Sequence, residues 1–113
     1  MDLIVVNAQI KANQYFAETL DQLEKDFLMI GVEYNIDKAV SNYQTLFAFT
    51  SNLINSINEQ NPMLLLNLLY RIDLSEKMVQ KKMKNTTLIF SEMLSELIVK
   101  RELYKVILKK DVS

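Results

Sequence analysis

Four carboxylate side chains stand close together near the start of the chain: Glu18, Asp21, Glu24 and Asp26. Asp21 and Glu24 are three residues apart, so on a helix they would share a face. Carboxylates that share a face could hold a metal ion or carry out acid-base chemistry. Charges on the side of a helix opposite its apolar stripe are ordinarily just solvated, and we therefore expect neither role for this cluster.

Histidine and cysteine are both absent from the chain. Their absence removes the side chains that dominate zinc sites, thiol nucleophiles and imidazole general bases. The inward-facing Glu-x-x-His pairs of a four-helix di-iron centre cannot form, and a chain with one glycine has no glycine-rich phosphate loop. The sequence therefore predicts a protein that is not an enzyme and that has no metal or cofactor.

The composition is that of an ordinary soluble domain. A chain of 113 residues can bury one core but not two. With 50% hydrophobic residues, 24% charged residues and a net charge of -1, it gives no electrostatic indication of a partner. Its first residues lack the positive region and cleavage site of a signal peptide, and no apolar run approaches the ~20 residues of a membrane span. We expect a cytoplasmic protein that does not enter a membrane.

The elements that must position any site are helices. One glycine and one proline in the whole chain are too few for the turns of an all-β domain. Apolar residues recur at steps of three and four, and they predict an all-α fold, a single domain over residues 1–113 built as a four- or five-helix bundle. The expected helices cover roughly residues 2–30, 36–59, 62–72, 75–84 and 87–110.

The boundaries of these helices have specific signals. Gly31 suits the left-handed position after the first helix, and Asn35 or Asp37 can cap the second. Asn61 can cap the third helix, with Pro62 in its first turn. The third helix is apolar almost all round, so we expect it to be the central element of the bundle. The first would be ~40 Å long, so part of it should protrude or pair with a second copy.

Two groups of residues allow both a structural and a functional interpretation. Methionines near the apolar faces could form an adaptable partner groove, but filling a core is their commoner use and is what we expect; they are Met63, Met78, Met83 and Met93. Arg71, Asp73 and Ser75 mark the turn between the third and fourth helices. We expect Asp73 or Ser75 to cap the fourth helix and Arg71 to stack on an aromatic ring or pair with a carboxylate across the turn. Tyr70, Arg71 and Asp73 could instead mark a ligand or partner site, but the structural role is the one that we expect.

Residues 61–84 resemble a helix-turn-helix, with an apolar first helix, a turn ending in Ser75 and a branched residue, Val79, at the fourth step of the second helix. This resemblance implies that one face of the second helix contacts DNA bases or phosphates. That face comprises Glu76, Lys77, Gln80, Lys81 and Lys84. Asp73 stands where the motif usually has glycine and Leu69 where it usually has a small residue, so nucleic-acid binding is our alternative interpretation.

The segment Tyr-Arg-Ile-Asp-Leu-Ser-Glu at residues 70–76, with the later Arg-Glu-Leu helix, is similar to a group of short, uncharacterised bacterial all-helical proteins. The resemblance covers about half of the chain. It implies a bacterial cytoplasmic helical protein and assigns no activity and no site residue.

The favoured function is a non-enzymatic interaction or regulatory module. Such a module acts by helical packing with a second copy of itself or with another protein. The apolar N-terminal residues Leu3, Ile4, Val5 and Val6 are the expected interface, although they could equally cover the monomer's own core.

Overall fold

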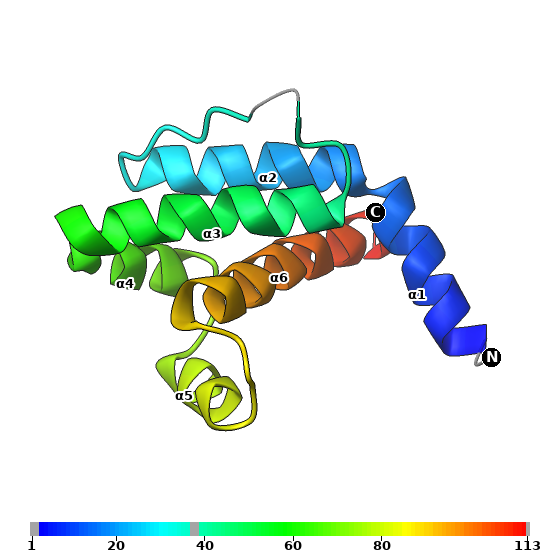
Figure 1. Cartoon of the computed structure of the whole chain (residues 1–113). Coiled ribbons are helices and arrows are strands. Elements are labelled where there is room, and N and C mark those ends of the chain that lie inside the picture. The colour runs from blue at the N-terminus through cyan, green and yellow to red at the C-terminus, as the bar shows by residue number, and fades with distance from the viewer. Residues whose placement is uncertain (1–2, 37–38, 113) are drawn as a thin grey trace.

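The computed structural model describes residues 3–36 and 39–112, and the side chains of residues 9–36 and 39–110. Within those ranges every regular element is an α-helix, which confirms the all-α prediction. Six helices replace the predicted four or five: α1 (Leu3–Gln14), α2 (Phe16–Met29), α3 (Tyr43–Gln60), α4 (Pro62–Arg71), α5 (Glu76–Lys84) and α6 (Phe90–Val112). They form one globule with principal extents of 42, 30 and 28 Å (Figure 1).

The longest helix, α6, lies at the centre of the bundle. It packs along α3 and α2, and α5 packs at its N-terminal end. The short helix α4 packs on the last turns of α3 (Figure 1). Leu23, Ile54, Leu68 and Ile98 come from four different helices and are completely buried between them. The prediction that residues 62–72 form the central element is therefore wrong. A helix of ten residues is only about 15 Å long and cannot reach across the bundle.

The predicted helix over residues 2–30 is interrupted at Tyr15, whose φ of -103° and ψ of 22° are not helical. The hydroxyl of Thr19 donates to the Tyr15 carbonyl at 2.8 Å, a side-chain bond of the kind that bends helices. The Tyr43 hydroxyl donates to the carbonyl of Ala12 at 2.6 Å. That carbonyl is the one that the N–H of Phe16 would use in a continuous helix. As a result α1 extends away from the globule (Figure 1).

The second predicted helix starts too early, because α3 begins only at Tyr43. Asn42 caps it by accepting from the N–H of Thr45 at 2.9 Å in a reciprocal capping box. Of the two predicted caps, Asn35 is exposed and lies in irregular chain, and Asp37 lies outside the described residues.

A buried tyrosine explains this late start. The ring of Tyr34 stacks on Phe27 with centroids 4.8 Å apart, and its hydroxyl lies 2.6 Å from that of Thr50. These contacts fix the connector on the core, so Ile36 and Val40 pack against the core without being helical.

Two helix ends follow the sequence signals. Gly31 has a φ of +84°, and the N–H of Val32 donates to the Phe27 carbonyl at 2.9 Å, which closes a Schellman motif after α2. Pro62 is the first residue of α4, as predicted. The side chain of Asn61 caps nothing, so that part of the prediction is wrong. In the described part of the chain, no helix has the length and apolar character needed to cross a membrane.

Candidate functional site

The four carboxylates of α2 do not converge. Asp21 and Glu24 are exposed and Glu18 is half-buried, whereas the side chain of Asp26 is only 2% exposed. The expectation of a solvated cluster is therefore wrong for Asp26. Nowhere among the described residues do three potential metal-ligating side chains gather.

Asp26 is the centre of a buried charge network that joins three helices. Its Oδ1 accepts from Nε of Arg71 in α4 at 2.9 Å. Its Oδ2 accepts from Nε2 of Gln22 at 2.9 Å and from Nζ of Lys105 in α6 at 3.4 Å. Arg71 therefore does not pair across the turn as predicted but links α4 to α2. It is Arg101 that reaches the turn, donating from Nε to the Ile72 carbonyl at 2.9 Å.

Glu102 lies fully buried beside this network, with Oε1 3.5 Å from Nζ of Lys105. Neither of its oxygens accepts a hydrogen bond from a described residue. Burial and the adjacent Asp26 carboxylate raise the pKa of Glu102 to about 9, so Glu102 is protonated at neutral pH. For Asp26, burial works to raise the pKa, but the neighbouring Glu102 and Gln22 side chains and the charge of Lys105 outweigh it, and the pKa is lowered.

This network connects α2, α4 and α6. Asp26 and Glu102 themselves are enclosed by the packed helices. The pair shows that one carboxyl is kept neutral and the other charged by their shared surroundings. Sequence reasoning missed it because its cationic members lie far away along the chain, Arg71 at 45 residues and Lys105 at 79 residues from Asp26.

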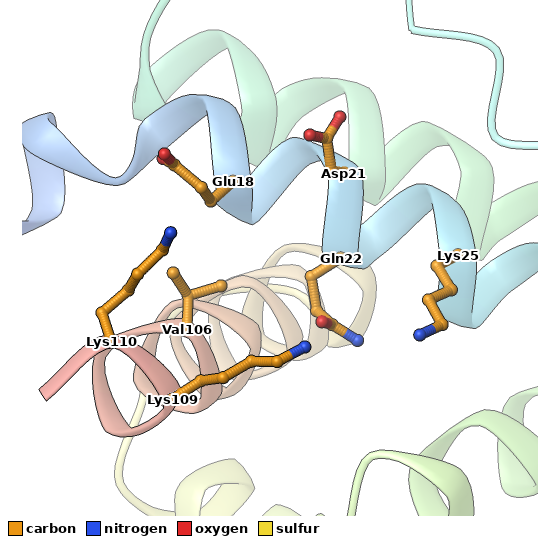
Figure 2. A pocket seen from close by; sticks show the side chains of 7 residues that line it. All are labelled: Glu18, Asp21, Gln22, Lys25, Val106, Lys109 and Lys110. Carbon is orange, nitrogen blue, oxygen red and sulfur yellow. The ribbon is translucent and has the colours of Figure 1, made fainter. Parts of the chain in front are cut away.

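A groove of about 430 Å³, lined mainly by residues with charged or polar side chains, follows the outer side of the α2–α6 contact. It is lined by Glu18, Asp21, Gln22, Lys25, Val106, Lys109 and Lys110. Figure 2 shows Lys109 and Lys110 reaching from α6 toward α2, while Asp21 points away from α6. Side chains of both charges thus line this groove without enclosing a common point, and it offers neither a metal site nor an acid-base pair.

A second groove, of about 300 Å³, is predominantly apolar and lies between α4, α5 and the start of α6. We call it the α4–α5 groove. Leu66 and Leu69 of α4 face Val79 of α5 across it. The remaining lining residues are Asn58, Pro62, Met63, Leu65, Glu76, Gln80, Phe90 and Leu94. It lies open at the surface and is the candidate functional site.

The methionines support this choice. Met93 is completely buried, as predicted for a core residue. The same prediction is wrong for Met63, Met78 and Met83, whose side chains are 60%, 55% and 50% exposed. Met63 lines the α4–α5 groove itself. Flexible thioether side chains at a surface are typical of sites that adapt to a partner.

The turn before α5 shows which of the two residues predicted as its cap, Asp73 or Ser75, has that role. Asp73 has a φ of 63° and takes the left-handed position, while the N–H of Leu74 donates to the Leu69 carbonyl at 2.9 Å. Ser75 caps α5, accepting from the N–H of Met78 at 3.2 Å. The predicted capping by Asp73 is wrong, because a residue in that conformation closes α4 and does not open α5.

The residues of the nucleic-acid alternative all lie exposed on α5: Glu76, Lys77, Gln80, Lys81 and Lys84. Val79 is buried, as a helix-turn-helix would require. However, α5 packs on α6, and the α4–α5 groove occupies the space where the two helices of that motif would meet. Leu69, which stands where the motif usually has a small residue, lies on the α4 side of this opening beside Leu66.

The predicted interface residues Leu3, Ile4, Val5 and Val6 lie in α1, on the part of the chain that extends from the globule (Figure 1). Their side chains are outside the described residues.

Comparison of the chain with protein-family models, with curated proteins and with solved structures found no significant match. The resemblance of residues 70–76 to a group of bacterial helical proteins stays a prediction.

Proposed function

We propose that this protein is a non-enzymatic interaction or regulatory module that binds a helix of a partner protein in the α4–α5 groove. The observation that carries the proposal is the open apolar groove left between α4 and α5, with Met63 exposed at its edge. Grooves of this kind receive the apolar face of an amphipathic helix, which buries side chains at every third or fourth position. The cytoplasmic location and bacterial origin expected from the sequence belong to the same proposal.

Self-association is the second part of the proposal, and it concerns α1 rather than the groove. The apolar residues Leu3, Ile4, Val5 and Val6 stand on a helix that extends from the globule (Figure 1). Apolar residues on a helix that extends from the globule favour its packing against a second copy. A mass that stays monomeric over a wide range of protein concentration would count against this part.

The experiment is recovery of partners from the native cells with the tagged full chain, identified by mass spectrometry, with and without nuclease. The wild type is compared with Met63→Glu, which places a charge in the α4–α5 groove. Met29→Glu is the matched control, because Met29 is 63% exposed, Met63 is 60% exposed, and Met29 is on α2 away from the groove. Neither substitution removes a buried side chain, so both variants should fold.

We expect one protein to be recovered in stoichiometric amount despite nuclease, to be lost with Met63→Glu and to be retained with Met29→Glu. Burial of a carboxylate against apolar surface without a partner is strongly unfavourable, which is why one substitution should suffice. Equal recovery with both variants would exclude the groove as the binding site. Recovery that disappears with nuclease would favour the nucleic-acid alternative, for which the exposed lysines of α5 are the supporting observation.

A further inference from the structure

The helix that forms one wall of the α4–α5 groove is the most basic element of the chain. In its nine residues α5 has four lysines and one glutamate, although the whole chain has a net charge of -1. Lys77 and Lys84 stand three residues before and four residues after Gln80, so they neighbour Gln80 on the surface of α5. Gln80 lines the groove. The two lysines therefore lie along its outer edge.

These lysines are not neutralised by the protein itself. Within the described residues, none of the four lysines of α5 forms an ion pair. The neighbouring helices differ in this respect, since Arg71 and Lys105 both pair with Asp26. Unpaired cations beside an apolar groove offer charge complementarity to a ligand that brings negative charge to that edge.

We propose, on the basis of the function proposed above, that the occupant of the α4–α5 groove is an acidic amphipathic helix of another protein. Its apolar face packs on Met63, Leu66 and Phe90, which are among the apolar lining residues that are not buried, and its carboxylates lie against Lys77 and Lys84. The helix α1 of a second copy does not meet this description, because residues 3–14 include no Asp or Glu.

The α5 lysines also suit a phosphate backbone, but the apolar groove favours a protein. Nucleic-acid binding draws its affinity from neutralised phosphates, and contact with leucine, valine and phenylalanine side chains does not add to that neutralisation. An amphipathic helix uses both the apolar groove and the basic edge. Duplex DNA is therefore an outcome of the test.

The probes are two synthetic peptides, each held helical by a lactam staple, with leucine at every third and fourth position. In one the remaining positions include glutamates along one edge, and in the other lysines replace those glutamates. Binding to the full chain is followed by fluorescence anisotropy, with a labelled DNA duplex as a third probe. The variants are Lys84→Glu and Met63→Glu, with Lys82→Glu as the control, since Lys82 is also in the last turn of α5 but on the side away from Gln80.

We expect the glutamate peptide to bind about tenfold more tightly than the lysine peptide, and Lys84→Glu to remove most of this preference while Lys82→Glu leaves it. Met63→Glu should weaken binding of both peptides.

Equal affinity for the two peptides, with both weakened by Met63→Glu, would overturn the acidic occupant while leaving the groove as a docking site. Binding of neither peptide would overturn the proposal as well, and the recovery experiment would then decide the proposed function separately. Binding of the duplex alone, lost with Lys84→Glu, would overturn it in favour of nucleic acid.

Discussion

Two neighbouring buried carboxyls have shifted pKa values, and each makes the stability of the fold depend on pH in its own direction. Glu102 has its pKa raised from 4.5 to about 9 by burial and by the adjacent Asp26. A carboxyl of this kind stabilises the fold fully below its unfolded pKa, and the stabilisation is lost as the pH rises toward the folded pKa. Asp26 acts in the opposite sense, because its lowered pKa favours the folded state above its unfolded pKa.

The free energy of unfolding of the wild type is therefore expected to fall as the pH rises from about 5 to about 9. Glu102→Gln keeps the shape and the donor of the protonated side chain and cannot ionise, so it should abolish most of this fall. Urea unfolding at a series of pH values measures the effect. Glu96→Gln on the same helix, where the side chain of Glu96 is 30% exposed, should leave the slope unchanged. Parallel curves for the wild type and Glu102→Gln would show that Glu102 is already ionised in the fold.

At the residue scale the sequence signals were accurate where they were local. Gly31 and Pro62 occupy the predicted positions, and Ser75 caps α5, because a backbone conformation or a cap depends on a few neighbouring residues. Burial of Asp26 and Glu102 could not be predicted, since charged residues are rarely buried and their partners come from distant parts of the chain.

At the scale of helices, periodicity identified the existence of elements better than their limits. Ile36 and Val40 have helical spacing but pack on the core from irregular chain, because Tyr34 is held by Phe27 and Thr50. The apolar spacing over residues 2–30 likewise continues across the break at Tyr15. In the sequence, only the methionines and Leu69 indicated the α4–α5 groove. Nothing in the sequence indicated that Phe90 would line its far side.

The position of the α3 start can be tested through its cap. Asn42→Ala removes the side-chain oxygen that accepts from Thr45, and it should lower the free energy of unfolding by about 1 kcal/mol. Asn35→Ala, at the end where a cap was predicted, should change it by less than about 0.5 kcal/mol, since Asn35 is exposed and caps no helix. Both values come from urea unfolding. A larger effect at Asn35 than at Asn42 would mean that the helix starts at the earlier position.

At the scale of the whole molecule, charge is unevenly divided. Residues 1–60 include eight acidic and three basic side chains, whereas residues 61–113 include six acidic and ten basic ones. The basic half includes α5 and the C-terminal turns of α6. This division places the binding edge proposed for an acidic helix on the part of the molecule that attracts anions from a distance.

Removal of residues 1–9 tests the contribution of the extended helix. Because α1 projects from the globule, the midpoint of thermal unfolding at low protein concentration should change by less than about 2 °C. Self-association, followed by sedimentation velocity over a range of concentrations, should be lost. Ile54→Ala, in the core, is the comparison and should lower the midpoint clearly. A lower midpoint of the truncated chain at every concentration would instead assign Leu3, Ile4, Val5 and Val6 to the monomer's own core.

The proton on Glu102 also affects how copies of the protein behave toward one another in solution. The formal net charge of -1 counts this residue as ionised, so with Glu102 protonated the folded chain has almost no net charge at neutral pH. Because the chain has no histidine, it lacks the side chain whose ordinary pKa lies between pH 5 and 8. Colloidal repulsion between folded molecules is then weak, and crowding them together costs little electrostatic energy. Under these conditions short-range contacts, rather than overall charge, determine whether the molecules associate.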